Sequence, residues 1–266
     1  MKGCTMLRTI TVTFGLLMLA ATGRAAPRLA DEPASPKEQY ERLVQEHEDG
    51  ATPRELAARF LELAQKHPRD PAALDALVWV LTKLRSRPEA ARALEHLETD
   101  HLKNEKLADA CPAIARTFST RAEKLLQAAL EKSPHKKVRA QACWSWAALL
   151  KQQATIVEQL KTEPESADRV VQYYGSDYGK HLTSLDGEKL ERQREQVYER
   201  LLKTFADEPV GDSTMGAEAE KGLFQIRHLS IGRSAAEIAG EDIFGKPFKL
   251  SDYRGKVVVL SFWGHW

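Results

Sequence analysis

The chain has 266 residues, of which 42% are hydrophobic and 29% are charged, and its formal net charge is +1. This balance indicates a globular protein and excludes an intrinsically disordered chain. No segment combines clustered Lys and Arg with interleaved aromatic residues, so we expect no nucleic-acid partner. Aromatic residues make up only 7%, while Ala, Leu, Glu, Lys and Arg are plentiful, which favours helix.

The amino terminus predicts a secretory signal peptide over residues 1–26. Lys2 and Arg8 supply positive charge, an apolar run from Ile10 to Ala21 follows, and small residues then provide a cleavage site. An uncleaved membrane anchor is the alternative, although the run is short for a bilayer span. We therefore expect an exported protein of the bacterial periplasm or cell envelope, with no stable membrane span after cleavage. A Pro- and Ala-rich linker over residues 27–35 precedes the first domain.

Residues 36–229 predict a helical domain. Four residues with capping side chains each precede a proline, namely Ser35, Thr52, Asp70 and Ser133. A cap of this kind accepts an orphan backbone N–H, and proline loses nothing at the first helical position. Thr52 and Glu55 also match a capping box.

Apolar residues between these starts recur at helical spacing. The predicted buried faces are Leu56, Phe60, Leu63 and Ala64; Leu74, Leu77, Val78, Leu81 and Leu84; Leu125, Leu126, Ala129 and Leu130; and Val197, Leu201, Leu202 and Phe205. A weak internal repeat links Lys66-His67-Pro68 to Lys132-Ser133-Pro134, with a looser third copy from Thr204 leading to a helix over residues 215–229. The first two copies begin 66 residues apart, at Lys66 and Lys132, which is about twice the period of a helical hairpin repeat. This resembles a degenerate tetratricopeptide-like array, and a plain helical bundle is the alternative.

Residues 161–187 are patterned less clearly. Val170, Val171 and Tyr174 could line a short helix, which Gly175, Gly179 and Gly187 are expected to break. Tyr173, Tyr174 and Tyr178 form a cluster that is typical of half-buried packing, with a binding patch as the alternative. The Glu, Lys and Arg residues over 188–200 predict a solvated helix face with i,i+4 pairs.

Three cysteines are present, and Cys4 leaves with the signal peptide. Cys111 and Cys143 lie in helical sequence, where they are expected to be small buried hydrophobes, with a disulfide as the alternative. The eight histidines lack metal-ligand spacing, and no phosphate-binding glycine loop occurs. We therefore expect neither a metal site nor a cofactor.

The pattern changes at Ile231. Residues 241–244 and 248–250 predict a β-hairpin around Gly245-Lys246-Pro247, and residues 251–255 predict a tight connection. The run Val257–Trp263 is nearly all β-branched and aromatic, which is typical of a strand buried on both faces.

Residues 231–266 resemble the amino-terminal part of the redoxin family, the AhpC/TSA-like and TlpA-like branch of the thioredoxin superfamily. The resemblance rests on Gly232, the Glu237-Ile238 strand start, Asp242 with Gly245-Lys246, Leu250–Tyr253, Arg254–Lys256, Val257–Leu260 and Phe262-Trp263. Two positions depart from the family pattern: Ala235-Ala236 stands for Ala-Pro, and Gly264-His265 for Ala-Thr.

The resemblance implies a thiol–disulfide oxidoreductase whose reactive C-x-x-C directly follows Trp266. The motif positions that flank this expected site are Phe262, Trp263 and Trp266, and no catalytic residue is assigned within the chain itself. The chain is therefore expected to be an inactive, truncated form that lacks the catalytic cysteines. The full-length protein would act on a protein thiol or disulfide partner.

The sequence thus predicts a mainly α protein: a helical repeat-like or bundle domain, then the β-hairpin and first core strand of an incomplete thioredoxin-like α/β domain. A second hypothesis is a non-enzymatic helical module that binds a protein partner and carries a remnant redoxin segment.

Overall fold

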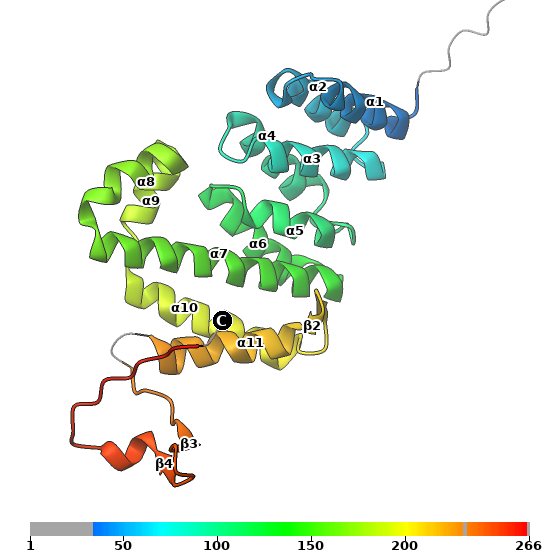
Figure 1. Cartoon of the computed structure of the whole chain (residues 1–266). Helices are drawn as coiled ribbons and strands as arrows, with labels where there is room; N and C mark the ends of the chain where they lie inside the picture. The colour runs from blue at the N-terminus through cyan, green and yellow to red at the C-terminus, as the bar shows by residue number, and fades with distance from the viewer. Residues whose placement is uncertain (1–33, 231–232, 265–266) are drawn as a thin grey trace, which may run out of the picture. The chain divides into compact units, whose positions relative to one another are not determined.

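A computed structural model describes residues 34–230 and 233–264 (Figure 1). The predicted signal peptide, and all but the end of the predicted linker, lie outside the described residues. The helical elements and strands, in chain order, are α1 (Pro36–Glu48), α2 (Pro53–Lys66), α3 (Pro71–Lys83), α4 (Pro88–Asp100), α5 (Leu107–Ala115), α6 (Thr120–Lys132), α7 (Lys136–Thr162), η1 (Pro164–Ser166), α8 (Ala167–Tyr174), α9 (Ser176–Thr183), α10 (Gly187–Thr204), β1 (Pro209–Val210), β2 (Ser213–Thr214), α11 (Met215–Phe224), η2 (Gln225–Leu229), β3 (Ala239–Glu241), β4 (Pro247–Lys249) and η3 (Leu250–Tyr253). The protein is mainly α, as its composition predicts.

Three of the four predicted helix starts are confirmed. Ser35 and Thr52 each form a capping box with the glutamate three residues later, and proline occupies the first helical position. The Asp70 carboxylate accepts the Ala72 N–H at 2.9 Å at the start of α3. These local hydrogen bonds satisfy backbone donors that have no partner inside the helix.

The predicted start at Ser133 is wrong. Ser133 follows the last residue of α6, and its N–H donates to the Ala129 carbonyl at 3.2 Å. Because a residue before proline disfavours the helical conformation, α6 ends there, and α7 begins only at Lys136. The start of α4 at Pro88 lacks a capping signal, because Arg87 precedes it and makes no side-chain cap.

The helices from α1 to α7 pack in two alternating layers. Contacts join not only neighbours in the chain but also next-but-one pairs: α1 with α3, α2 with α4, α3 with α5, α4 with α6 and α5 with α7. The helices therefore follow one another as a stack (Figure 1), and α10 then packs on α7 and α11 on α10. This arrangement favours a helical stack over a bundle around one axis.

One continuous apolar core runs through the stack. Its buried members extend from Leu43 of α1 to Ile226 of η2. Nearly all of the predicted apolar faces are buried; only Val78 and Leu202 are half-buried. The helix predicted over residues 215–229 forms as α11 and a final π-helical turn, η2.

The pair α8 and α9 forms a satellite with its own small apolar cluster of Ile156, Val170, Tyr178 and Leu182. Gly175 separates the two helices with a positive φ of 86°, as predicted. Gly179 and Gly187, however, break nothing, because they lie inside α9 and at the first position of α10. A Cβ at Gly179 would lie 2.5 Å from the Val171 Cα, so this glycine permits the close crossing of α8 and α9.

Two antiparallel hairpins complete the described structure. β1 pairs with β2 between α10 and α11, a short hairpin that the sequence did not signal. The second hairpin is the predicted one, and its strands begin and end at other residues than predicted. β3 pairs with β4, Gly240 lies opposite Phe248, and residues 242–246 form the turn.

Candidate functional site

The turn between β3 and β4 is organised by Asp242. Its Oδ1 accepts the backbone N–H groups of Phe244 and Lys246, each at 2.9 Å. Gly245 donates to the Asp242 carbonyl at 2.9 Å and takes a positive φ of 79°, a conformation that favours glycine. Aspartate and glycine thus have defined structural roles in this part of the redoxin-like motif.

The connection after the hairpin is also held by side-chain caps. The Asp252 Oδ2 accepts the Lys249 N–H at 2.9 Å, and the Glu237 Oε1 accepts the Ser251 N–H at 3.0 Å. The pKa of the Glu237 carboxyl is lowered below its ordinary value by hydrogen bonds from Ser251, chiefly from its side chain and also from its backbone. The predicted tight connection is therefore a 3₁₀ turn followed by Gly255, whose φ is 81°.

The predicted core strand Val257–Trp263 is not formed. These residues make no strand pairing within the described chain. Val257 and Val259 are 97% and 88% exposed, and Phe262 and Trp263 are 84% and 86% exposed. A β-branched run forms a strand only when a neighbouring strand pairs with its backbone N–H and C=O groups. No strand in the described part of the chain pairs with this segment.

The structure places Phe262 and Trp263 at the end of this exposed segment, where no described residue assembles with them into a reactive site. Trp266, together with His265, Ile231 and Gly232, lies outside the described residues.

The two described cysteines are buried and free. The Cys111 thiol donates to the Leu107 carbonyl at 3.3 Å, and the Cys143 thiol faces the Val197 carbonyl at 3.9 Å. Burial raises the pKa of both thiols to about 12. Because the thiolate is the nucleophile in disulfide exchange, neither residue can serve as a reactive cysteine at neutral pH.

The tyrosine cluster spans a range of environments. Tyr178 is buried, and its hydroxyl accepts a hydrogen bond from Gln153 Nε2 at 3.2 Å, whereas Tyr174 is half-buried and Tyr173 is 70% exposed. Phe118 joins them from another segment, with its ring 4.6 Å from that of Tyr174. The prediction of half-buried packing is confirmed for Tyr174. The sequence around Phe118 does not indicate that its ring contacts the tyrosines.

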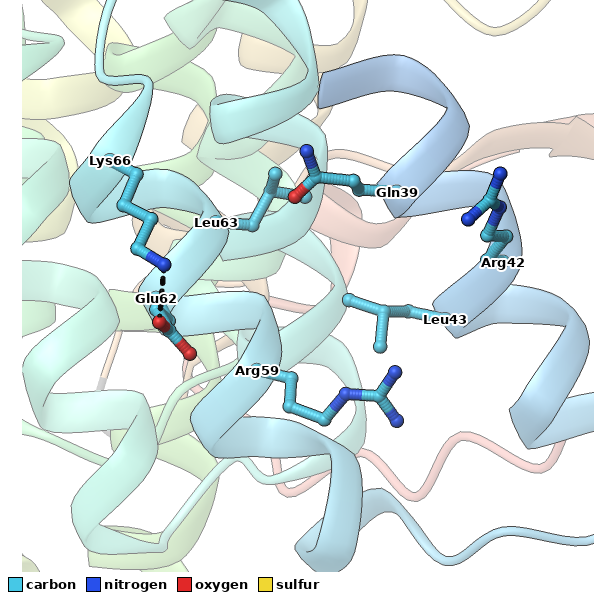
Figure 2. Close-up of a pocket in the computed structure, with 7 residues that line it drawn as sticks. All are labelled: Gln39, Arg42, Leu43, Arg59, Glu62, Leu63 and Lys66. Carbon is cyan, nitrogen blue, oxygen red and sulfur yellow. Dashed lines mark ion pairs between the residues drawn. The ribbon is translucent and has the colours of Figure 1, made fainter. Parts of the chain in front are cut away.

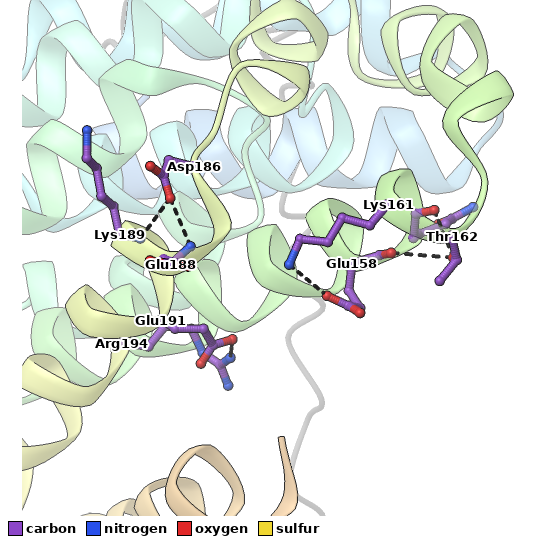
Figure 3. Close-up of polar contacts among 9 residues, drawn as sticks. Glu158, Lys161, Thr162, Asp186, Glu188, Lys189, Glu191 and Arg194 are labelled. Atoms are coloured by element: carbon purple, nitrogen blue, oxygen red, sulfur yellow. Dashed lines mark hydrogen bonds and ion pairs between the residues drawn. The ribbon is translucent and has the colours of Figure 1, made fainter. Parts of the chain in front are cut away.

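The charged run at 188–200 is not a purely solvated face. Arg192 and Glu188 form an exposed i,i+4 pair at 3.5 Å, as predicted. Arg194, however, is only 8% exposed and donates to Glu191 Oε1 at 2.6 Å (Figure 3). The helical spacing of the sequence could have predicted this burial, because position 194 lies on the same face of α10 as Leu190, Val197 and Leu201. Arg194 Nε and Glu191 Oε2 are buried without a hydrogen-bond partner among the described atoms.

No group of three or more His, Cys, Asp or Glu side chains in residues 34–230 and 233–264 could hold a metal ion. None of the helices in these ranges has the length and apolar composition needed to cross a bilayer.

Comparison with known proteins finds similarity in one short stretch. The chain is 42% identical over 38 residues to the thiol-disulfide oxidoreductase ResA of Geobacillus thermodenitrificans (strain NG80-2). It is 45% identical over 38 residues to ResA of Geobacillus kaustophilus (strain HTA426). In both cases the match covers 14% of this chain and 22% of the relative, so the chain spans about a fifth of the length of these curated relatives.

No family model matches the chain, and no solved structure matches it. The comparisons therefore indicate a short thioredoxin-like segment within a mainly helical protein.

Proposed function

We propose that this chain belongs to a thiol–disulfide oxidoreductase in which a helical region precedes a redoxin-type domain. The observation that carries the proposal is the similarity of a 38-residue stretch to two thiol-disulfide oxidoreductases. We assign that stretch to the C-terminal segment, because the redoxin-like motif positions occur there and nowhere else in the sequence.

The proposed chemistry needs a thiolate and a resolving cysteine. A cysteine at a helix amino terminus has a lowered thiol pKa, attacks a partner's disulfide sulfur, and forms a mixed disulfide. The second cysteine then attacks that mixed disulfide, which releases the reduced partner and oxidises the C-x-x-C pair. Cys111 and Cys143 are excluded from this role by their burial and by a thiol pKa of about 12. The resemblance to the redoxin family implies instead a C-x-x-C pair directly after Trp266.

The proposed setting is the bacterial periplasm or cell envelope, with a protein thiol or disulfide as the substrate. The charge, apolar run and small residues of positions 1–26 support export. Mass spectrometry of the protein from its native host would test it. The expected mature chain begins near residue 26, and an intact Met1 would contradict export by cleavage.

The redox proposal is tested in two steps. Reading the coding sequence beyond the codon for Trp266 is expected to show C-x-x-C in the next positions. Insulin reduction is then measured for residues 1–266, for the protein extended through a complete domain, and for the extended protein with the first cysteine of that pair changed to serine.

Activity is expected only in the extended protein with both cysteines. An extended protein carrying Cys111→Ala and Cys143→Ala serves as the control and should retain its activity. Equal turnover by the 1–266 chain would show that the active site has been misplaced.

A further inference from the structure

The turn between α3 and α4 carries a cluster of basic side chains. Lys83 ends α3, and Arg85 and Arg87 follow in the turn, so that three exposed cations lie within five residues. None of the three forms an ion pair with a carboxylate in the described part of the chain. In residues 34–230 and 233–264, no other stretch of five residues holds three Lys or Arg side chains without an ion pair.

The groove between α1 and α2 (Figure 2) has the opposite arrangement, because its cations lie beside carboxylates. Lys66 Nζ lies 2.6 Å from Glu62 Oε1, and Arg59 Nη2 donates to Glu46 Oε1 at 2.8 Å. Pairs of this kind compensate the local charge within the protein itself. The turn after α3 lacks such compensation, so its charge remains available to a partner of opposite sign.

The backbone of this basic turn is anchored to the core. Leu84 is 9% exposed and belongs to the apolar core, and the Arg87 N–H donates to the Leu84 carbonyl at 2.8 Å. Arg87 directly precedes α4 but makes no side-chain cap, so its guanidinium is not used by the helix. The partial positive charge of the helix amino terminus adds to the charge of the cluster. An anchored backbone also loses less conformational freedom when a partner binds.

The composition of the turn favours a protein as the anionic partner. Segments that bind anionic lipids carry about four to eight cations, whereas residues 82–88 carry fewer, and Leu84, their one large apolar residue, is buried. The same residues include no aromatic ring on which a nucleic-acid base could stack. The planar fork of an arginine, in contrast, matches a carboxylate with two parallel hydrogen bonds.

We propose that the basic turn of Lys83, Arg85 and Arg87 binds an acidic segment of a partner protein, whose carboxylates pair with these three cations. Five consecutive residues span at most about 14 Å, so an acidic run of similar length covers the turn. This inference is independent of the redox proposal, because it concerns the helical region alone.

The test uses the full chain and the blocked, fluorophore-labelled peptide GDEDEG, with GNQNQG and GKRKRG as neutral and basic analogues. Fluorescence anisotropy is expected to show binding of GDEDEG that weakens with added salt, because salt screens exposed charges, and much weaker binding of both analogues. The double variant Arg85→Gln with Arg87→Gln is expected to weaken GDEDEG binding about fivefold or more, since two charge-assisted contacts are lost.

The matched control is the double variant Arg69→Gln with Lys106→Gln. These two cations are exposed, form no ion pair in the described part of the chain, and lie in other turns, and their replacement changes the net charge equally. The control should bind GDEDEG within about twofold of the unaltered chain, since exposed charges away from the turn contribute little. Circular dichroism verifies that both variants keep the same helix content.

Four outcomes would each overturn the proposal. Equal losses in the two double variants would show that net charge alone drives binding. Binding of GKRKRG as tight as that of GDEDEG, or no anisotropy change at millimolar protein, would show that the turn does not select an acidic segment. Binding to vesicles that contain anionic phosphatidylglycerol, without binding of GDEDEG, would assign the turn to a membrane surface instead.

Discussion

Gly222 of α11 lies directly against the ring of Tyr198 in α10. A Cβ at this position would lie 2.6 Å from Tyr198 Cζ, closer than any real contact. Tyr198 is 6% exposed and sits in the helix interface, so it has little room to move. The absence of a side chain at position 222 therefore sets how closely α11 approaches α10.

Gly222→Ala is expected to lower the free energy of unfolding by about 1–3 kcal/mol, because overpacking forces the ring or the helix to shift. The control is Gly187→Ala, where the added Cβ would lie 3.1 Å from the flexible end of Lys161 and 3.2 Å from Val157 Cγ1, both well beyond the 2.6 Å at Gly222. Urea unfolding followed by circular dichroism would measure both variants. Equal stability of the two would contradict the assigned role of Gly222.

The thiols of Cys111 and Cys143 are expected to react with a disulfide reagent such as DTNB at pH 8 only when the protein unfolds. Both are buried, and burial raises their pKa from the ordinary value of 9.0 to about 12. Labelling should therefore be slow in buffer and rapid in denaturant. Rapid labelling of the folded chain would contradict the burial of these groups.

The same thiols give a pH dependence with a defined sign. In the unfolded chain they ionise near pH 9.0, while in the folded chain they stay protonated up to about pH 12. Within this window the unfolded state binds fewer protons, so the free energy of unfolding falls as pH rises. The fall should be smaller in a variant with alanine at both positions, and an identical pH profile would contradict this account.

The hydrogen bonds of the capping side chains distinguish residues that begin a helix from residues that only precede a proline. Thr52 accepts the Glu55 N–H, and Glu55 in return accepts the Thr52 N–H at 2.8 Å. Ser133 precedes a proline in the same way, but it follows the end of α6, and its hydroxyl meets only the His135 N–H at 3.4 Å. The same pattern, a hydroxyl residue before proline, therefore begins a helix at Thr52 and follows the end of one at Ser133.

Thr52→Ala is expected to lower the free energy of unfolding by about 1 kcal/mol, because the Glu55 N–H loses its side-chain acceptor and the capping box is broken. Ser133→Ala is expected to lower it less, because the Ser133 hydroxyl accepts only one long hydrogen bond, from the His135 N–H at 3.4 Å. Thermal denaturation of both variants measures the contrast. A larger loss at Ser133 would restore the interpretation of this residue as a helix cap.

The segment Val257–Trp263 illustrates how a strand depends on its neighbours. Its residues have high strand propensity, yet they lie exposed and unpaired in the described chain. Strand pairing joins distant parts of a chain, so propensity alone cannot form it. Because it is exposed, uncharged and unpaired, this segment is also suited to edge-to-edge association.

In the whole molecule, the apolar core ends before the C-terminal segment begins. The core includes residues from Leu43 to Ile226, and no described residue from 233 to 264 is buried. Stability should therefore reside in the helical region, since burial of apolar surface is its main source.

A fragment of residues 35–230 is expected to unfold cooperatively, within about 3 °C of the full chain, because it keeps every side chain that is buried in residues 34–230 and 233–264. Circular dichroism during heating of both proteins tests this. A fragment without a cooperative transition would show that the C-terminal segment contributes to the core.

The sequence by itself determined the helical class, the starts of α1, α2 and α3, the apolar faces and the hairpin around Gly245, because each depends on local chemistry. Capping side chains and turn glycines satisfy backbone groups within a few residues, and helical periodicity is written along one segment. The redoxin-like motif is likewise local, so it could be recognised without a structure.

Only the tertiary structure decided the burial of Arg194, the close contacts of Gly179 and Gly222, the aromatic partner Phe118 and the unpaired state of residues 257–263. It also brought Arg42 and Arg59 to opposite sides of one groove. Each of these features depends on which residue of another element lies opposite, and side-chain spacing within one segment carries no information about that partner.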